Sequence, residues 1–236
     1  MTHLHADHLD ATAVEALPKE VAVLCQPPDA TALRKRGFVD VRPVEEALDW
    51  ESLRLTRTNG RHGTGEIGER MAPVSGFVIT TPDEPTLYIA GDTIWCDEVR
   101  EAVDRHRPAI IVANAGGARF LEGDPITMTA DDVVALARHA TGARILAVHL
   151  EAINHCVETP TDLRARLEHE QLQERVSVPD DGDAVTLSWP LRAVTEARPR
   201  VVRANGPGLC LRDYVLIHNV GVTLPLSPIS HFHTLR

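Results

Sequence analysis

Basic residues are scarce in this sequence relative to acidic ones. The 236 residues include 24 Lys and Arg against 34 Asp and Glu, which gives a formal net charge of −10 with histidine neutral. An acidic chain repels phosphate backbones, so we do not expect a nucleic-acid partner. Hydrophobic residues make up 43 % of the chain, which is enough to build the core of one large domain or two small ones.

The sequence also lacks paired cysteines and long apolar runs. Its four cysteines are far apart and form no C-x-x-C pair: Cys25, Cys96, Cys156 and Cys210. This spacing indicates reduced thiols, as in the cytoplasm, rather than a disulfide framework. No apolar run reaches the ~18 residues of a membrane-spanning helix, so we expect no membrane partner. Internal repeats are absent as well.

Strands that form hairpins come first, and alternating helices and strands follow. Apolar or alternating stretches predict early strands over 21–25, 52–58, 74–81 and 85–92. Short helices are predicted over 11–18 and 30–38. Later helices over 96–106, 129–140 and 160–171 alternate with strands over 109–114, 144–150 and 175–179. This order favours a sheet-rich α/β sandwich over a doubly wound parallel sheet.

The densest chemistry stands at the beginning of the sequence, in "MTHLHADHLD". This stretch holds four side chains that bind metals: His3, His5, Asp7 and His8. Imidazole suits zinc, iron and similar divalent ions, and carboxylate adds a harder ligand. In a loop after a strand, the spacing can direct two imidazoles to one point and Asp7 with His8 to a second. The alternative is a histidine-rich segment that holds no metal.

Three further candidate ligands stand where predicted strands end. His62 lies in the glycine-rich stretch "TNGRHGTGEIG", Asp92 ends "TLYIAGD" and His149 ends "RILAVH". Loops at strand ends often carry functional residues on a rigid scaffold. These positions therefore argue against the alternative that the histidine-rich segment holds no metal. The stretch "GTGEIG" at 63–68 lacks the Lys and Ser or Thr of a phosphate-binding loop. We expect it to be a flexible loop that shapes the pocket.

Together, "THLHADH", the histidine of the glycine-rich loop, "GDT" and the late strand-end histidine resemble the metallo-β-lactamase superfamily. Within it, the chain is most similar to the metal-dependent hydrolases around L-ascorbate-6-phosphate lactonase. The resemblance covers residues 1–190 and implies an αββα sandwich with two divalent ions, zinc or else manganese or iron. It implies that the first ion is held by His3, His5 and His62, the second by Asp7, His8 and His149, and that Asp92 bridges both.

Two adjacent ions would turn a bridging water into a hydroxide, which would attack an ester, lactone or phosphoester of a small metabolite. Asp7 is a candidate proton acceptor as well as a ligand. His155 is a candidate catalytic residue because it follows His149 on the same loop, with an ordinary polar loop as the alternative. Asn114 and Asn154 are candidate substrate-binding residues, although Asn114 could instead cap a turn.

Two other functions stay open at this point. A phosphodiesterase or nuclease of the same fold would use the same metals, although the acidic charge argues against RNA. A truncated protein that binds metal without activity is the alternative that is not an enzyme. The expected partner is a small-molecule substrate, and a homo-oligomer is compatible with the sequence.

The extent of the domain leads to two expectations. In proteins of this superfamily several strands precede the metal-binding motif, whereas Met1 and Thr2 alone precede it here. We therefore expect the hydrolase domain, residues 1–190, to be N-terminally incomplete, to lack its first strands and to bind metal weakly. Residues 191–236 are rich in Arg, Pro and Gly and then apolar without a clean period, so we expect an atypical C-terminal tail.

Overall fold

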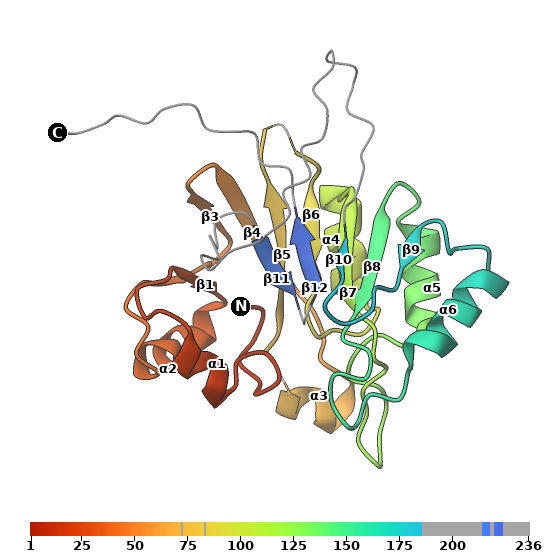
Figure 1. Cartoon of the computed structure of the whole chain (residues 1–236), viewed down its shortest axis with the longest axis horizontal. Helices are drawn as coiled ribbons and strands as arrows, with labels where there is room; N and C mark the ends of the chain where they lie inside the picture. The colour runs from red at the N-terminus through yellow and green to blue at the C-terminus, as the bar shows by residue number, and fades with distance from the viewer. Residues whose placement is uncertain (72, 83, 186–213, 218–219, 224–236) are drawn as a thin grey trace.

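The computed structural model describes residues 1–71, 73–82, 84–185, 214–217 and 220–223, and it shows a mixed α/β protein built around one large sheet (Figure 1). The strand order in this sheet follows the sequence order, so each strand pairs with the next one along the chain. Its strands are β3 (Ala47–Trp50), β4 (Leu53–Asn59), β5 (Ser75–Thr80), β6 (Leu87–Ile89), β7 (Ile110–Asn114), β8 (Arg144–Val148) and β9 (Val176–Ser177).

Pairing in the large sheet changes from antiparallel to parallel at β6. The pairs from β3 to β6 are antiparallel, and those from β6 to β9 are parallel. Parallel neighbours need a crossover, and the crossovers are α4 (Asp97–His106), α5 (Ala130–His139) and α6 (Pro160–His169). Right-handed crossovers that all step in one direction place their helices on one face. The carboxyl ends of β6, β7 and β8 therefore meet at one edge of the sheet.

Apolar layers cover both faces of the parallel half of the sheet. On the helix side, Val78, Tyr88, Ile111 and Ile145 belong to the same buried cluster as apolar residues of α4, α5 and α6. On the other side, the buried residues are Leu87, Ile110, Val112, Leu146 and Val148. Because side chains alternate between the faces, burial of both faces explains why β7 and β8 are continuous apolar runs in the sequence.

A smaller unit precedes the large sheet and holds the first metal-binding segment. It comprises α1 (Ala11–Ala16), β1 (Val23–Cys25), the 3-10 helix η1 (Pro27–Asp29), α2 (Ala30–Lys35) and β2 (Val41–Pro43). Leu9, Leu33 and Phe38 are buried in its core, against which Met1 and Leu4 pack. The Ser75 backbone N–H donates to the Thr2 carbonyl at 3.1 Å. Residues 3–8 are thus held between this unit and the beginning of β5.

Most predicted elements are confirmed, and the helix predicted over 129–140 begins with a capped end. Thr129 precedes α5, accepts a hydrogen bond from the Asp132 backbone N–H, and forms a capping box with it. The expectation of a flexible loop over 63–68 is wrong in part, because α3 (Gly65–Met71) begins inside it. Gly63 and Gly65 take left-handed φ angles of 102° and 56° that turn the chain into this helix. The short strands β2 and β3 were not predicted.

The described residues of the expected tail form strands. β11 (Tyr214–Ile217) pairs antiparallel with β12 (Val220–Thr223), and β12 pairs parallel with β10 (Ala184–Val185). The rest of 191–236 lies outside the described residues, so the expected boundary after residue 190 stays a prediction. Within the described part of the chain, no helix is long and apolar enough to span a membrane.

Candidate metal centre

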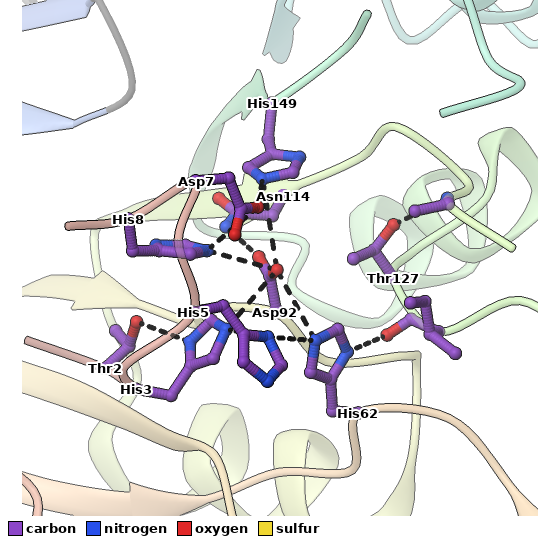
Figure 2. Close-up of polar contacts among 12 residues, drawn as sticks. Thr2, His3, His5, Asp7, His8, His62, Asp92, Asn114, Thr127 and His149 are labelled. Atoms are coloured by element: carbon purple, nitrogen blue, oxygen red, sulfur yellow. Dashed lines mark hydrogen bonds and ion pairs between the residues drawn. The ribbon is translucent and has the colours of Figure 1, made fainter. Parts of the chain in front are cut away.

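Four segments that are distant in sequence bring the seven predicted metal ligands together (Figure 2). The N-terminal loop supplies four of them, and the others follow β4, β6 and β8 directly. Their donor atoms form two groups, and within each group all atoms lie within 4.8 Å of one another. The first group is His3, His5 and His62; the second is Asp7, His8, Asp92 and His149.

Distances in the first group suit a single ion. His3 Nε2 lies 2.9 Å from His5 Nδ1, which lies 3.3 Å from His62 Nε2. Ligand atoms 2.0–2.1 Å from a tetrahedral zinc ion are separated by about 3.3 Å. His3 and His62 are buried and His5 is half-buried, so water has limited access to the three nitrogen atoms that point at one another. A cation at their meeting point would compensate them.

The second group consists of two histidine–aspartate contacts. His8 Nε2 lies 3.1 Å from Asp92 Oδ2, and His149 Nε2 lies 3.1 Å from Asp7 Oδ2. His8 Nε2 is also 3.7 Å from Asp7 Oδ2, which joins the two pairs into one cluster. Asp7 is the more exposed carboxylate, with 17 % of its side chain accessible against 2 % for Asp92. The second group therefore opens toward solvent at Asp7.

Asp92 lies between the two groups. Its Oδ2 atom is 3.1 Å from His8 Nε2 and 3.9 Å from His149 Nε2 in the second group. The same oxygen is 3.7 Å from the Nε2 atoms of both His3 and His62 in the first. Its other oxygen, Oδ1, accepts a hydrogen bond from Asn114 Nδ2. One carboxylate oxygen thus faces both donor groups.

Burial and charge prepare the two groups differently for metal binding. Burial lowers the pKa of His3 to about 2, with the nearby His8 acting in the same direction, and burial also lowers the pKa of His62. Both imidazoles are therefore neutral at pH 7, which is the form that binds metals. Burial opposes ionisation of Asp92, but the hydrogen bond and charge of His8 outweigh it and hold the pKa of Asp92 well below its usual range.

The contact between His149 and Asp7 behaves as an ion pair. Burial acts to lower the pKa of His149, but the hydrogen bonds to Asp7 and Cys156 and the charge of Asp92 together outweigh it, and the pKa rises to about 10. Burial acts to raise the pKa of Asp7, and the hydrogen bond with His149 lowers it below its usual range. In the metal-free chain the proton on His149 thus compensates a carboxylate. A divalent cation would replace that proton.

Groups behind the ligands fix their orientation. His62 Nδ1 donates to the Ile126 carbonyl at 2.7 Å, which leaves the Nε2 lone pair free to face the centre. His3 Nδ1 lies 3.2 Å from Thr2 Oγ1, and His149 Nδ1 lies 3.9 Å from Cys156 Sγ. Sequence reasoning missed these contacts. Only the contact of Thr2 could have been found in the sequence, since Thr2 adjoins a candidate ligand. The contact of Ile126 could not, because any residue type offers the same backbone carbonyl.

Left-handed backbone places two of the strand-end ligands. Gly91, directly before Asp92, has a φ of 73°, and a Cβ atom there would lie 3.0 Å from Thr2 Cβ. Glycine thus allows the N-terminal loop to approach the end of β6. His149 has a φ of 63°, a conformation that costs a non-glycine residue about 1–2 kcal/mol. In this backbone conformation the side chain of His149 reaches Asp7.

The other predicted site residues lie around the cluster rather than in it. His155 Nδ1 is 3.2 Å from Asn154 Oδ1, and the His155 ring stacks on that of Phe120 at 5.4 Å between centroids. Asn114 is buried beneath Asp92 and contacts this ligand. The predicted roles of His155, Asn154 and Asn114 toward substrate, and of Asp7 as a proton acceptor, stay predictions.

The sequence matches a known domain family and is similar to UPF0173 proteins, one of which is named a metal-dependent hydrolase. The beta-lactamase superfamily domain matches residues 1–150. The UPF0173 protein YddR of Bacillus subtilis (strain 168) is 34 % identical over 188 residues, which cover 79 % of this chain and 74 % of that protein. The UPF0173 metal-dependent hydrolase R01310 of Rhizobium meliloti (strain 1021) is 25 % identical over 194 residues, 79 % of this chain and 80 % of that protein.

Two solved structures combine a similar fold with similar sequence. A possible metal-dependent hydrolase from Veillonella parvula DSM 2008 gives a TM-score of 0.74 at 33 % identity, over 77 % of this chain and 72 % of that one. The isothiocyanate hydrolase from Delia radicum gut bacteria gives a TM-score of 0.73 at 33 % identity, over 77 % of this chain and 73 % of that one. These similarities agree with the α/β fold predicted from the sequence.

Proposed function

The chain belongs to the beta-lactamase superfamily, and we propose that it is a metal-dependent hydrolase that acts through two ions. The observation that carries this proposal is the position of Asp92 Oδ2, which lies 3.1–3.9 Å from the Nε2 atoms of four histidines. Four imidazole nitrogens gathered around one carboxylate oxygen form a ligand set that suits borderline divalent cations. Because Asp92 adjoins both donor groups, it could serve a cation in each of them.

The donor set fits two borderline divalent ions. We place the first ion among His3, His5 and His62, and the second among Asp7, His8 and His149, with Asp92 shared. Nitrogen-rich ligand sets with one or two carboxylates suit zinc, and they also accept manganese or iron. Zinc is our proposal because imidazoles provide five of the seven ligands.

When bound, such ions activate water as a nucleophile and polarise the bond that is broken. The remaining tasks belong to side chains of this chain. Asp92 is held in one orientation by Asn114. Asp7 is the carboxylate open to solvent, so we propose that it accepts the proton of the attacking water. His155, on the loop that leaves β8, is our proposed contact to substrate or general acid.

An ester, lactone or phosphoester of a small metabolite is the proposed substrate class. Hydrolysis of an isothiocyanate is a second candidate, because the similar isothiocyanate hydrolase shares 33 % identity over 77 % of this chain. The central carbon of the N=C=S group is electrophilic, as a carbonyl carbon is, so the same nucleophile serves both reactions. The net charge of −10 argues against the nuclease alternative, since it repels a polyanion.

The test is metal content, measured by mass spectrometry on untagged protein, together with turnover of an ester, a lactone, a phosphodiester and an isothiocyanate. We expect close to two ions per chain and hydrolysis of at least one substrate. Asp92→Ala should lose most of both ions. The matched control is Asp97→Ala, whose side chain is 83 % exposed on α4. An Asp92→Ala protein that keeps both ions would refute the shared ligand.

A further inference from the structure

Exposed large apolar side chains are concentrated on two loops that contact or carry candidate ligands. Among the residues that the structure describes, four such side chains are exposed: Val39, Phe120, Leu121 and Val157. Three of the four lie on the two loops that follow β7 and β8. We call Phe120, Leu121 and Val157 the apolar lip. Single exposed apolar residues are ordinary, but a group of them next to a candidate site is not.

The loop that carries Phe120 and Leu121 is in contact with both donor groups at its base. Near its beginning, Gly116 packs so closely that a Cβ atom there would lie 2.4 Å from the His149 carbonyl oxygen. Near its end, the Ile126 carbonyl accepts the hydrogen bond from His62 Nδ1. The Ile126 backbone N–H closes the loop by donating to the Ala118 carbonyl at 2.7 Å. Both ends of the loop that carries Phe120 and Leu121 are therefore anchored at candidate ligands.

The second loop is fastened to the first. The Val157 backbone N–H donates to the Gly116 carbonyl at 3.0 Å, and the Arg119 N–H donates to the His155 carbonyl at 3.0 Å. The Phe120 ring stacks on the His155 ring with an angle of 21° between their planes. Phe120 still has 44 % of its surface exposed. The apolar lip is thus held in place by backbone hydrogen bonds while its outer face stays available to a ligand.

The same two loops carry an excess of negative charge. Over residues 115–129 and 149–159, a single basic side chain, Arg119, stands against four acidic ones: Glu122, Asp124, Glu151 and Glu158. Acidic groups on loops that adjoin a site repel anions and lower their local concentration. A phosphorylated substrate would meet repulsion from these two loops, whereas a neutral substrate would not.

From the lip and its charge we infer that the substrate is uncharged and that an apolar group of it, aryl or alkyl, rests on Phe120 and Leu121 while its scissile bond faces the metals. The inference rests on the proposed hydrolase function and narrows it to neutral esters, lactones or isothiocyanates. It also gives His155 a second task, because its ring supports the one that contacts the substrate.

The experiment compares the zinc-loaded wild type with the double variant Phe120→Ser/Leu121→Ser. The control is Val39→Ser, which removes an exposed apolar side chain outside both loops. Two esters with the same leaving group, methyl phenylacetate and methyl acetate, report on the aryl group alone. In the double variant we expect KM for methyl phenylacetate to rise about tenfold, as when roughly 60 Å² of apolar surface loses its cover. KM for methyl acetate should change much less, and metal content should stay the same, so the ratio of the two KM values reports on the aryl group.

Binding of benzyl alcohol, which has no hydrolysable bond, is titrated by saturation-transfer NMR in the same proteins. We expect its Kd to weaken about tenfold in the double variant and to stay constant in Val39→Ser. Unchanged binding, or a KM that rises equally for both esters, would overturn the inference. If the wild type hydrolyses none of the substrates but the double variant binds benzyl alcohol more weakly, the apolar lip is supported as a binding surface and the proposed hydrolase function is refuted.

Discussion

Replacing Asn114 by Ala tests whether the shared carboxylate needs a fixed orientation. Asn114 Nδ2 donates to Asp92 Oδ1, and the two side chains come from residues that are 3 % and 2 % exposed. Water cannot readily take the place of the amide at such a site. Hydrogen bonds to charged groups contribute about 1.5–3 kcal/mol, and 1.4 kcal/mol corresponds to a tenfold change in affinity. We therefore expect zinc affinity to fall by about 10- to 100-fold, the range of ligand-supporting groups.

The assay is competition for zinc with a chromophoric chelator at pH 7.5, with Asn59→Ala as the control. Asn59 ends β4 and is exposed, so its loss should leave zinc affinity unchanged. A second readout is KM, which separates the two roles that have been considered for Asn114. If Asn114→Ala keeps its zinc affinity and raises KM instead, Asn114 binds substrate, and the argument from the hydrogen bond is refuted.

Three further predictions concern backbone, charge and catalysis. Gly91→Ala should lower Tm and zinc content together, because it forces a φ of 73° on alanine and brings a Cβ to 3.0 Å from Thr2; an unchanged thermal melt would contradict this. In the metal-free protein, the pKa of His149 is raised from 6.5 to about 10. The stability from its protonation is present below pH 6.5 and is lost toward pH 10, so Tm of chelator-treated protein should fall over that range, and less in His149→Gln. His155→Ala should keep both ions but lose turnover; loss of metal would instead make His155 a ligand.

The candidate ligands could be singled out from the sequence because most of them are tied to a local pattern, and the structure brings these residues together. His3, His5, Asp7 and His8 share one short motif, whereas Asp92 and His149 end apolar runs that could be recognised as strands. Where buried parallel strands end together, their last side chains converge. Such local patterns can be recognised in a sequence because they depend on the hydrophobicity of neighbouring residues.

Features that depend on contacts between distant backbone groups could not be predicted. The hydrogen bond from His62 to the Ile126 carbonyl spans 64 residues and uses no side chain of Ile126. α3 begins at Gly65, a residue with low helix propensity, so tertiary packing rather than local preference selects it. The left-handed φ of His149 has no signal either, because the residue is not glycine. These features need the assembled sheet.

The contact between Asp7 and His149 joins residues 142 positions apart in the chain. Ribosomes add about 5–20 residues per second, so roughly 7–30 seconds separate the synthesis of the two side chains. During that interval the N-terminal histidines have left the ribosome, but the strand that supplies His149 does not yet exist. The second donor group is therefore complete only when His149, the last of its residues to be synthesised, has been added. An ion captured early by His3 and His5 would therefore be bound before the second donor group is complete.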